Sequence, residues 1–168
     1  MVIYKKENVI AFYGKDDYMS NHYESKFMLD GSIFRHVEQA MMFLKAKLFG
    51  DDEMAMKIFN SYNPKRCKEL GRRVRNFEQN VWDDNKCDIV KRCVRAKFKQ
   101  NVELNKKLRD TKNALIVEAS PHDDIWGVKL HKNDIKVTNP NKWKGKNLLG
   151  KIIMEVREEI NQPVWGGY

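Results

Sequence analysis

The hydrophobic pattern of residues 37–49 is typical of an amphipathic helix, yet two charged residues interrupt its apolar face. At roughly 100° per residue, the apolar side chains share one broad arc: Val37, Met41, Met42, Leu44, Ala46, Leu48 and Phe49. Glu38 and Lys45 fall near the middle of this arc, whereas Gln39 and Lys47 lie on its margin or beyond. The two charges are about two helical turns apart, so both should point into whatever the arc packs against.

A buried carboxylate and a buried ammonium need a partner or a ligand, because burying an unpaired charge is costly. Glu38 and Lys45 are too far apart for a favourable pair within one helix, where pairs form at three or four residues. One interpretation is a face that is open at one end, so that both side chains reach water. The other is a pocket floored by this helix, with Glu38 and Lys45 as its working groups.

The rest of the pattern predicts a little β-structure among further helices. Residues 9–13 and 114–118 read as strands, and residues 26–34 as a hairpin, because Asp30-Gly31 tolerates the positive φ of a tight turn. Helical periodicity and caps predict further helices over residues 51–60, 65–73, 78–99, 102–109 and 146–161. We therefore expect a mainly α fold with a small β-component (α+β), as one compact domain over residues 1–168 with its core at 9–160 and a loose tail at 161–168.

Chemically capable side chains gather directly after the second predicted strand, in residues 119–127. They include Ser120, His122, Asp123 and Trp126. Active-site residues are commonly placed on such loops. The alternative is a turn in which Ser120 or Asp123 caps the backbone and Trp126 fills a gap in the core.

Two later segments of the chain show no clear periodicity before the last predicted helix. Residues 129–143 lack periodicity and are expected to form a polar loop. Gly145-Lys146-Asn147 precedes the last predicted helix. Free N–H groups and the helix dipole favour negative charge at such a position, so this segment is a candidate anion site.

The chain carries a formal charge of +9, with 32 Lys and Arg against 23 Asp and Glu. This balance favours phosphate-bearing partners without distinguishing DNA, RNA or a nucleotide. The basic run at residues 71–75 is either a solvated face or a phosphate contact. The three cysteines and four histidines of the chain show no metal-ligand spacing, so we expect no metal and no cofactor. Without an apolar membrane span or a leader pattern, a cytoplasmic location is expected.

Short motifs lie in order along the chain, in residues 37–42, 45–51, 70–72, 96–98, 118–121 with 123 and 126–127, and 145–150. This ordered set resembles the YbiA-like family, also called the NADAR (NAD and ADP-ribose associated) domain. Ala40 stands where the family usually has Tyr or Phe. His122-Asp123-Asp124 is one of several forms of its loop.

The resemblance implies a compact, mainly helical domain with N-glycosidase activity on a ribose C1′–N bond. Two substrate classes follow from it: ADP-ribose linked to guanine, free or in nucleic acid, which the charge favours, and phosphorylated early intermediates of riboflavin synthesis. A non-catalytic ADP-ribose-binding or nucleotide-binding module is a further alternative. After the enzyme and the binding module, a third class of function is a nucleic-acid binder that tolerates any sequence, and charge alone supports it.

Glycosidase chemistry gives the candidate residues their expected roles. Glu38 is the first choice for general acid or base, and Asp123 the second carboxylate. A desolvated Lys45 keeps a nucleophilic fraction that can capture C1′ as a Schiff base, a role that the resemblance favours. Trp126 would stack on the base. The other expected substrate-binding residues are Ser20, Asn21, Arg72, Lys97, Ser120 and Asn147.

Overall fold

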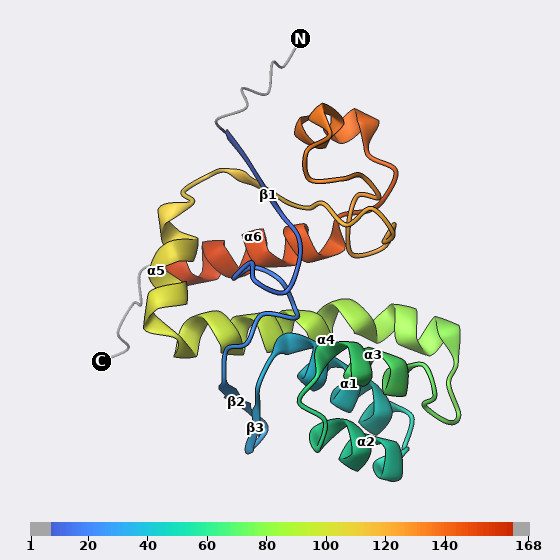
Figure 1. Cartoon of the computed structure of the whole chain (residues 1–168). Coiled ribbons are helices and arrows are strands. Elements are labelled where there is room, and N and C mark those ends of the chain that lie inside the picture. The colour runs from blue at the N-terminus through green and yellow to red at the C-terminus, as the bar shows by residue number, and fades with distance from the viewer. Residues whose placement is uncertain (1–7, 163–168) are drawn as a thin grey trace. The chain divides into compact units, whose positions relative to one another are not determined.

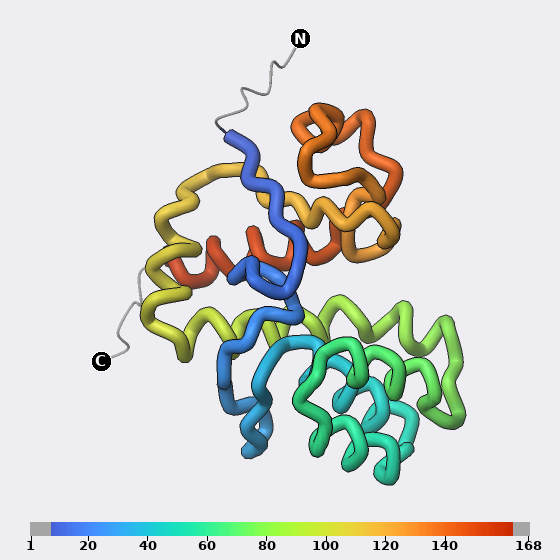
Figure 2. The backbone as a smooth tube through the Cα atoms, viewed as in Figure 1, coloured from blue at the N-terminus to red at the C-terminus, as the bar shows by residue number. Residues whose placement is uncertain are grey.

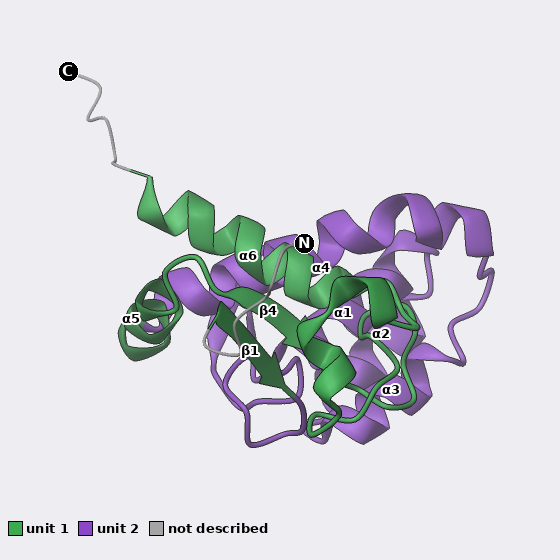
Figure 3. Ribbon diagram, turned by 90° about the horizontal axis from the view of Figure 1, so that it is seen from above, with its two compact units in different colours: residues 1–12, 102–168 green, residues 13–101 purple. Residues whose placement is uncertain are grey.

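A computed structural model describes residues 8–162, and Figures 1 and 2 trace the chain through them. The mainly α fold with a small β-component is confirmed. The chain forms two compact units, coloured in Figure 3: unit 1 contains β1 and the chain from Val102 onward, and unit 2 contains Tyr13–Asn101. Each unit has one pair of strands. The part of the expected loose tail beyond residue 162 lies outside the described residues.

Unit 2 consists of a hairpin and four helices whose ends follow from their sequence. In the hairpin, Asp30 and Gly31 have φ of 49° and 78°, as the predicted tight turn requires. Asp51 caps the second helix by accepting from the Met54 N–H at 3.1 Å, and Asn63 caps the third helix, which starts with proline. The elements are β2 (Phe27–Leu29), β3 (Ser32–Phe34), α1 (Val37–Leu48), α2 (Asp52–Phe59), α3 (Pro64–Gly71) and α4 (Gln79–Gln100).

More of helix α1 is buried than the apolar arc predicted from the sequence. It packs against α2, α3 and α4, and its first six residues are all buried. Gln39, expected at the margin, is 1% exposed. Leu48, expected on the buried arc, is 37% exposed. The arc prediction is therefore wrong at these two positions, because the Gln39 side chain bonds the carbonyls of Phe59 and Ser61, while Leu48 is exposed at the end of the helix.

Unit 1 is built on two parallel strands, β1 (Val9–Phe12) and β4 (Leu115–Glu118), joined in register from Val9 with Leu115 to Phe12 with Glu118. Helix α6 (Leu148–Asn161) packs against β4, and α5 (Val102–Asp110) packs against α6. No helix within residues 8–162 is both long and apolar enough to cross a membrane.

The segment between the loop after β4 and α6 is more ordered than the polar loop expected for residues 129–143. It contains two short 3-10 helices, Ile135–Thr138 and Pro140–Lys142. Leu130 and Val137 are buried in a small apolar core with residues of β4, and the Trp143 indole N–H donates to the Val137 carbonyl at 3.0 Å. The packing against β4 joins residues that are distant in the sequence, so local periodicity does not predict it.

Candidate functional site

Glu38 is buried in the first turn of α1. Only 4% of the residue is exposed, and its N–H donates to the Asn21 carbonyl at 2.9 Å. Glu38 Oε2 lies 3.7 Å from Nε2 of His22. The positive end of the helix dipole favours a carboxylate at this position. Glu38 thus lies against the turn at residues 20–22, within unit 2.

The start of α1 is fixed by polar contacts that the sequence analysis missed. His36 caps the helix, its Nδ1 accepting from the Gln39 N–H at 3.1 Å. The Gln39 amide donates to the carbonyls of Phe59 and Ser61 at 2.8 and 3.0 Å, which ties α1 to the connection between α2 and α3. Because Gln39 follows Glu38 directly, these bonds hold the backbone that carries the acid. Gln39 stands next to Glu38 in the family motif, and this adjacency is the sequence feature that could have indicated its role.

The turn at residues 20–22 brings three predicted binding residues together. Lys97 of α4 is 1% exposed, and its Nζ donates to the Ser20 carbonyl at 3.0 Å. Asn21 is 8% exposed, and its Oδ1 is buried without a hydrogen-bond partner in the described part of the chain. Buried acceptors in folded proteins nearly always have a partner. An unpartnered side-chain oxygen on Asn21 is therefore unusual, and it leaves a free hydrogen-bond acceptor beside Glu38.

His22 is an uncharged neighbour of Glu38 at neutral pH. Burial lowers the pKa of His22 to about 4, and the charges of Lys68 and Lys65 on α3 act in the same direction. The contact with Glu38 is consequently that of a neutral imidazole with an acid, not an ion pair. A neutral ring presents one N–H donor and one acceptor nitrogen.

Lys45 is half-buried near the end of α1. Its Nζ donates to the Gly71 carbonyl at 2.9 Å and lies 4.5 Å from the centre of the Phe77 ring. Burial lowers the pKa of Lys45, the negative charge of Glu38 raises it, and the charge of Arg72 lowers it. The net direction is downward, so a larger fraction of Lys45 is neutral than in a solvated lysine.

The loop at residues 119–127 in unit 1 is shaped by Asp123. Its Oδ1 accepts from the N–H groups of Ile125 and Trp126 at 2.9 and 2.8 Å. This is the backbone-capping turn that the sequence left open as an alternative. Ser120 is buried, and Trp126 is half-buried.

The anion site expected at the start of α6 is wrong. The N–H groups of residues 146–149 donate to carbonyl oxygens of residues 124–127 at 2.8 to 3.2 Å. The prediction needed free N–H groups, and the preceding loop occupies these four. Gly145 allows this close approach, because a Cβ there would lie 2.3 Å from the Gly127 carbonyl oxygen.

Asn147 has a structural role that the sequence analysis did not foresee. It is fully buried, with φ of 52°, and its side-chain amide bridges the edge of β4. Its Nδ2 donates to the Ile116 carbonyl at 3.0 Å, and its Oδ1 accepts from the Glu118 N–H at 2.9 Å. Its predicted contact with a substrate stays a prediction.

The ten predicted residues divide between the two units. Unit 2 holds Ser20, Asn21, Glu38, Lys45, Arg72 and Lys97, and unit 1 holds Ser120, Asp123, Trp126 and Asn147. Contacts among Ser20, Lys97, Asn21 and Glu38 form one cluster, and Lys45 binds the carbonyl of the residue before Arg72. Unit 2 thus contains an acid, an amine and cationic groups in one neighbourhood.

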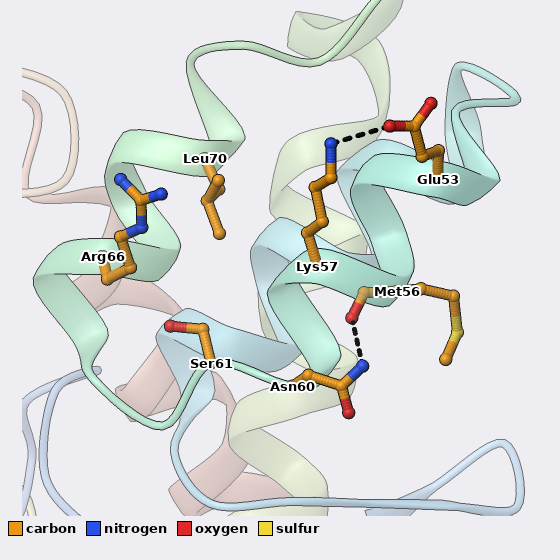
Figure 4. Close-up of a pocket in the computed structure, with 7 residues that line it drawn as sticks. All are labelled: Glu53, Met56, Lys57, Asn60, Ser61, Arg66 and Leu70. Carbon is orange, nitrogen blue, oxygen red and sulfur yellow. Dashed lines mark hydrogen bonds and ion pairs between the residues drawn. The ribbon is translucent and has the colours of Figure 1, made fainter.

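A separate surface pocket of about 590 Å³ lies between α2 and α3 and contains none of the predicted site residues (Figure 4). Its charged lining groups are paired: Lys57 bonds Glu53 at 2.7 Å, and Arg66 bonds Glu69 at 3.2 Å. The pocket therefore offers an anionic ligand no unpaired cation from its lining.

Two of the three cysteines, Cys67 and Cys93, are buried. Burial raises the pKa of Cys67 to about 11 and of Cys93 to about 12, so both thiols are protonated at neutral pH. The burial of Cys93 in the core was predicted and is confirmed. Within residues 8–162, no three His, Cys, Asp or Glu side chains are grouped to hold a metal ion.

The NADAR domain family matches residues 11–161, so the chain belongs to this family. The chain is 50% identical over 140 residues to N-glycosidase R617 of Acanthamoeba polyphaga mimivirus, with 82% of each chain covered. It is 30% identical over 159 residues to N-glycosidase YbiA of Escherichia coli K12, covering 92% of this chain and 90% of YbiA.

The NMR structure of E. coli YbiA has the same fold, with a TM-score of 0.75 at 27% identity. The match covers 93% of this chain and 86% of that one. A riboflavin biosynthesis protein of Vibrio vulnificus, VVA0006, is 26% identical over 159 residues, which are 93% of this chain and 40% of that protein. The resemblance expected from the motifs is thus confirmed.

Proposed function

We infer that this chain is an N-glycosidase, a hydrolase of N-glycosyl bonds, and we propose that its substrate is ADP-ribose linked to guanine. The observation that carries the proposal is a buried acid and a desolvated amine on one helix, Glu38 and Lys45 of α1. The names of R617 and YbiA support the activity. The free acceptor on Asn21 beside the acid suits a ribose hydroxyl.

In the proposed mechanism Glu38 starts protonated and Lys45 neutral, and the amine of Lys45 attacks C1′ of the ribose. The C1′–N bond breaks, and the leaving guanine nitrogen takes a proton from Glu38. Opening of the sugar ring gives a Schiff base between C1′ and Nζ. Water, losing a proton to the Glu38 carboxylate, adds to C1′ and releases ADP-ribose and the free amine. This cycle uses one water and restores both side chains.

The remaining predicted residues complete the proposal. Asp123 is the proposed second carboxylate, and Trp126 the surface on which the base stacks. Ser20, Asn21, Arg72, Lys97, Ser120 and Asn147 are the proposed contacts to ribose hydroxyls and phosphates. We propose the cytoplasm as the location and a nucleotide-like phosphorylated molecule or ADP-ribosylated nucleic acid as the partner.

Phosphorylated riboflavin intermediates are the second candidate substrate, favoured by the name of VVA0006. They present the same bond and a phosphate to the same residues. The net charge of +9 favours the first candidate in its nucleic-acid form, because a nucleic-acid strand carries more negative charge than one phosphomonoester.

The test is a substrate panel combined with chemical trapping. ADP-ribosyl-guanosine, an ADP-ribosylated oligonucleotide and the amino-pyrimidine phosphates are each incubated with the protein, and released base or sugar is measured by mass spectrometry. Borohydride added during turnover should leave a reduced sugar adduct on the peptide that contains Lys45. An unmodified peptide during active turnover would remove the covalent role.

Two results would replace the proposal itself. Tight ADP-ribose binding without turnover of any substrate would indicate the non-catalytic module. Binding that depends on salt but is indifferent to ADP-ribose would indicate a general nucleic-acid binder.

A further inference from the structure

Helix α3 carries three cations on one side without an ion-pair partner in the described chain. Lys65, Lys68 and Arg72 fall within about 60° on a helical projection at 100° per residue, and all three are exposed. We call these three residues the α3 stripe. Two nearby cations do have partners: Arg66 pairs with Glu69, and Arg75 with Asp51.

The helix that carries the α3 stripe runs along α1 from the acid of the candidate site to its amine. At one end, Cys67 and Gln39 bind the same Ser61 carbonyl, so α3 lies beside the start of α1, where Glu38 is buried. At the other end, Lys45 Nζ bonds the Gly71 carbonyl, directly before Arg72. A Cβ on Gly71 would lie 2.0 Å from the Met42 sulfur, which shows how closely the two helices pack.

The charges on α3 already act on the site. Those of Lys68 and Lys65 contribute to the lowered pKa of His22, and that of Arg72 to the lowered pKa of Lys45. Three unpaired like charges along one helix face repel one another, and a bound polyanion relieves that repulsion. Lys65 to Arg72 spans about 10 Å at 1.5 Å per residue. That length exceeds the two directly linked phosphates of one ADP-ribose.

We propose that the α3 stripe binds successive phosphates of a nucleic-acid strand flanking the nucleotide on which the enzyme acts. This inference rests on the proposed function and deepens it, because it assigns the substrate to a strand and not to a free nucleoside. Arg72 lies nearest the amine, and Lys65 and Lys68 extend the contact away from it. No base is read by the lysines, so the contact is independent of sequence.

The test compares one double variant with a matched control on two substrates. K65Q/K68Q removes two charges of the stripe, and K57Q/R66Q removes two paired charges beside it. For each protein, kcat/KM is measured on an oligonucleotide bearing ADP-ribosyl-guanine and on ADP-ribosyl-guanosine, between 50 and 300 mM salt. Unmodified single-stranded oligonucleotide binding is followed by fluorescence anisotropy.

We expect K65Q/K68Q to lower the ratio of the two kcat/KM values, oligonucleotide over nucleoside, about tenfold at low salt. Two lost phosphate contacts should reduce the slope of log kcat/KM against log salt by about 1.4 for the oligonucleotide. The control should keep the wild-type ratio and slope. An unchanged ratio in K65Q/K68Q would overturn the proposal, whether both substrates or neither were affected.

Failure of the proposed function would look different. If the wild type cleaves neither ADP-ribosylated substrate, the substrate assignment fails. Anisotropy then decides the strand contact alone: weaker oligonucleotide binding by K65Q/K68Q than by K57Q/R66Q supports it, and equal binding overturns it.

Discussion

Two helix starts in this protein are built alike, yet their polar side chains are used differently. In unit 2, the Asn21 carbonyl accepts from the N–H of Glu38 at the start of α1. In unit 1, carbonyls of residues 124–127 accept from the start of α6. At α6, the side chains of Asp123 and Asn147 are occupied by backbone partners. At α1, by contrast, the side-chain Oδ1 of Asn21 has no hydrogen-bond partner among the described residues.

This difference distinguishes side chains that hold the fold from side chains that are available for a substrate. A group that already bonds the backbone with good geometry holds the fold, and using it for a ligand breaks a buried bond. A buried acceptor without a partner is available to a ligand at no such cost. We therefore assign the bond-breaking step to the start of α1, and we expect substitutions at the start of α6 to act first on stability.

The largest expected effect is on turnover, from Glu38→Gln. The amide keeps the shape of the side chain but cannot exchange a proton, so kcat should fall by about 10²–10⁴-fold while ligand binding persists. Asp123→Asn is the matched change in unit 1: the amide oxygen can still accept from Ile125 and Trp126, so the turn survives. Steady-state kinetics and calorimetric binding of ADP-ribose measure both variants.

The relative loss of activity in these two variants tests the comparison between the two helix starts. A larger loss in Glu38→Gln than in Asp123→Asn supports the assignment to α1. Full activity in Glu38→Gln would require a different acid, and a greater loss in Asp123→Asn would move the chemistry to unit 1.

The second comparison is between two buried asparagines, Asn147 and Asn21. Asn147→Ala leaves the Glu118 N–H and the Ile116 carbonyl without partners, and we expect unfolding free energy to fall by about 2–4 kcal/mol. Asn21→Ala removes an oxygen without a partner and should cost under about 1 kcal/mol. Instead, its KM should rise about tenfold, from one lost hydrogen bond to substrate.

Urea unfolding and steady-state kinetics on both variants give the answer. Asn147→Gly is the control for backbone strain, because glycine adopts the positive φ freely and alanine does not. A large stability loss in Asn21→Ala with unchanged KM would show that its oxygen is structural, and the contrast between the two helix starts would disappear.

What the sequence could predict follows the range of the interactions involved. The hairpin turn and most helices depend on neighbouring residues, and the sequence predicts them. Glu38 was found because a charge within an apolar arc is a local signal. The pairing of β1 with β4 was not predicted, because its partners lie about a hundred residues apart.

The errors have the same cause. The helical projection places Gln39 at a margin, because it takes no account of the carbonyls of Phe59 and Ser61, which lie at the end of α2 and just after it. The N–H groups at the start of α6 looked free because the carbonyls that bind them lie some twenty residues earlier. Hydrogen-bond satisfaction by distant backbone is invisible to periodicity, so a polar residue beside a helix start reads equally well as a site and as a cap.

The smallest expected effect is the pH dependence of stability that His22 contributes. Its pKa is about 4 when folded and about 6.5 when unfolded, so the unfolded chain binds more protons between these values. The contribution of His22 is therefore complete above about pH 6.5 and is lost as pH falls toward 4. Since its side chain is 28% exposed, we expect about 1–2 kcal/mol lost between pH 7 and 5.

His22→Gln removes this titration and serves as the comparison, with unfolding measured in urea at pH 7 and at pH 5. Burial also lowers the pKa of His36, so the wild type and the variant share that second loss, and only their difference reports His22. A variant that loses as much stability as the wild type would mean that His22 titrates like a solvated histidine. The start of α1 would then be as open to water as an ordinary loop, and Glu38 would lack the dry neighbourhood on which its assignment depends.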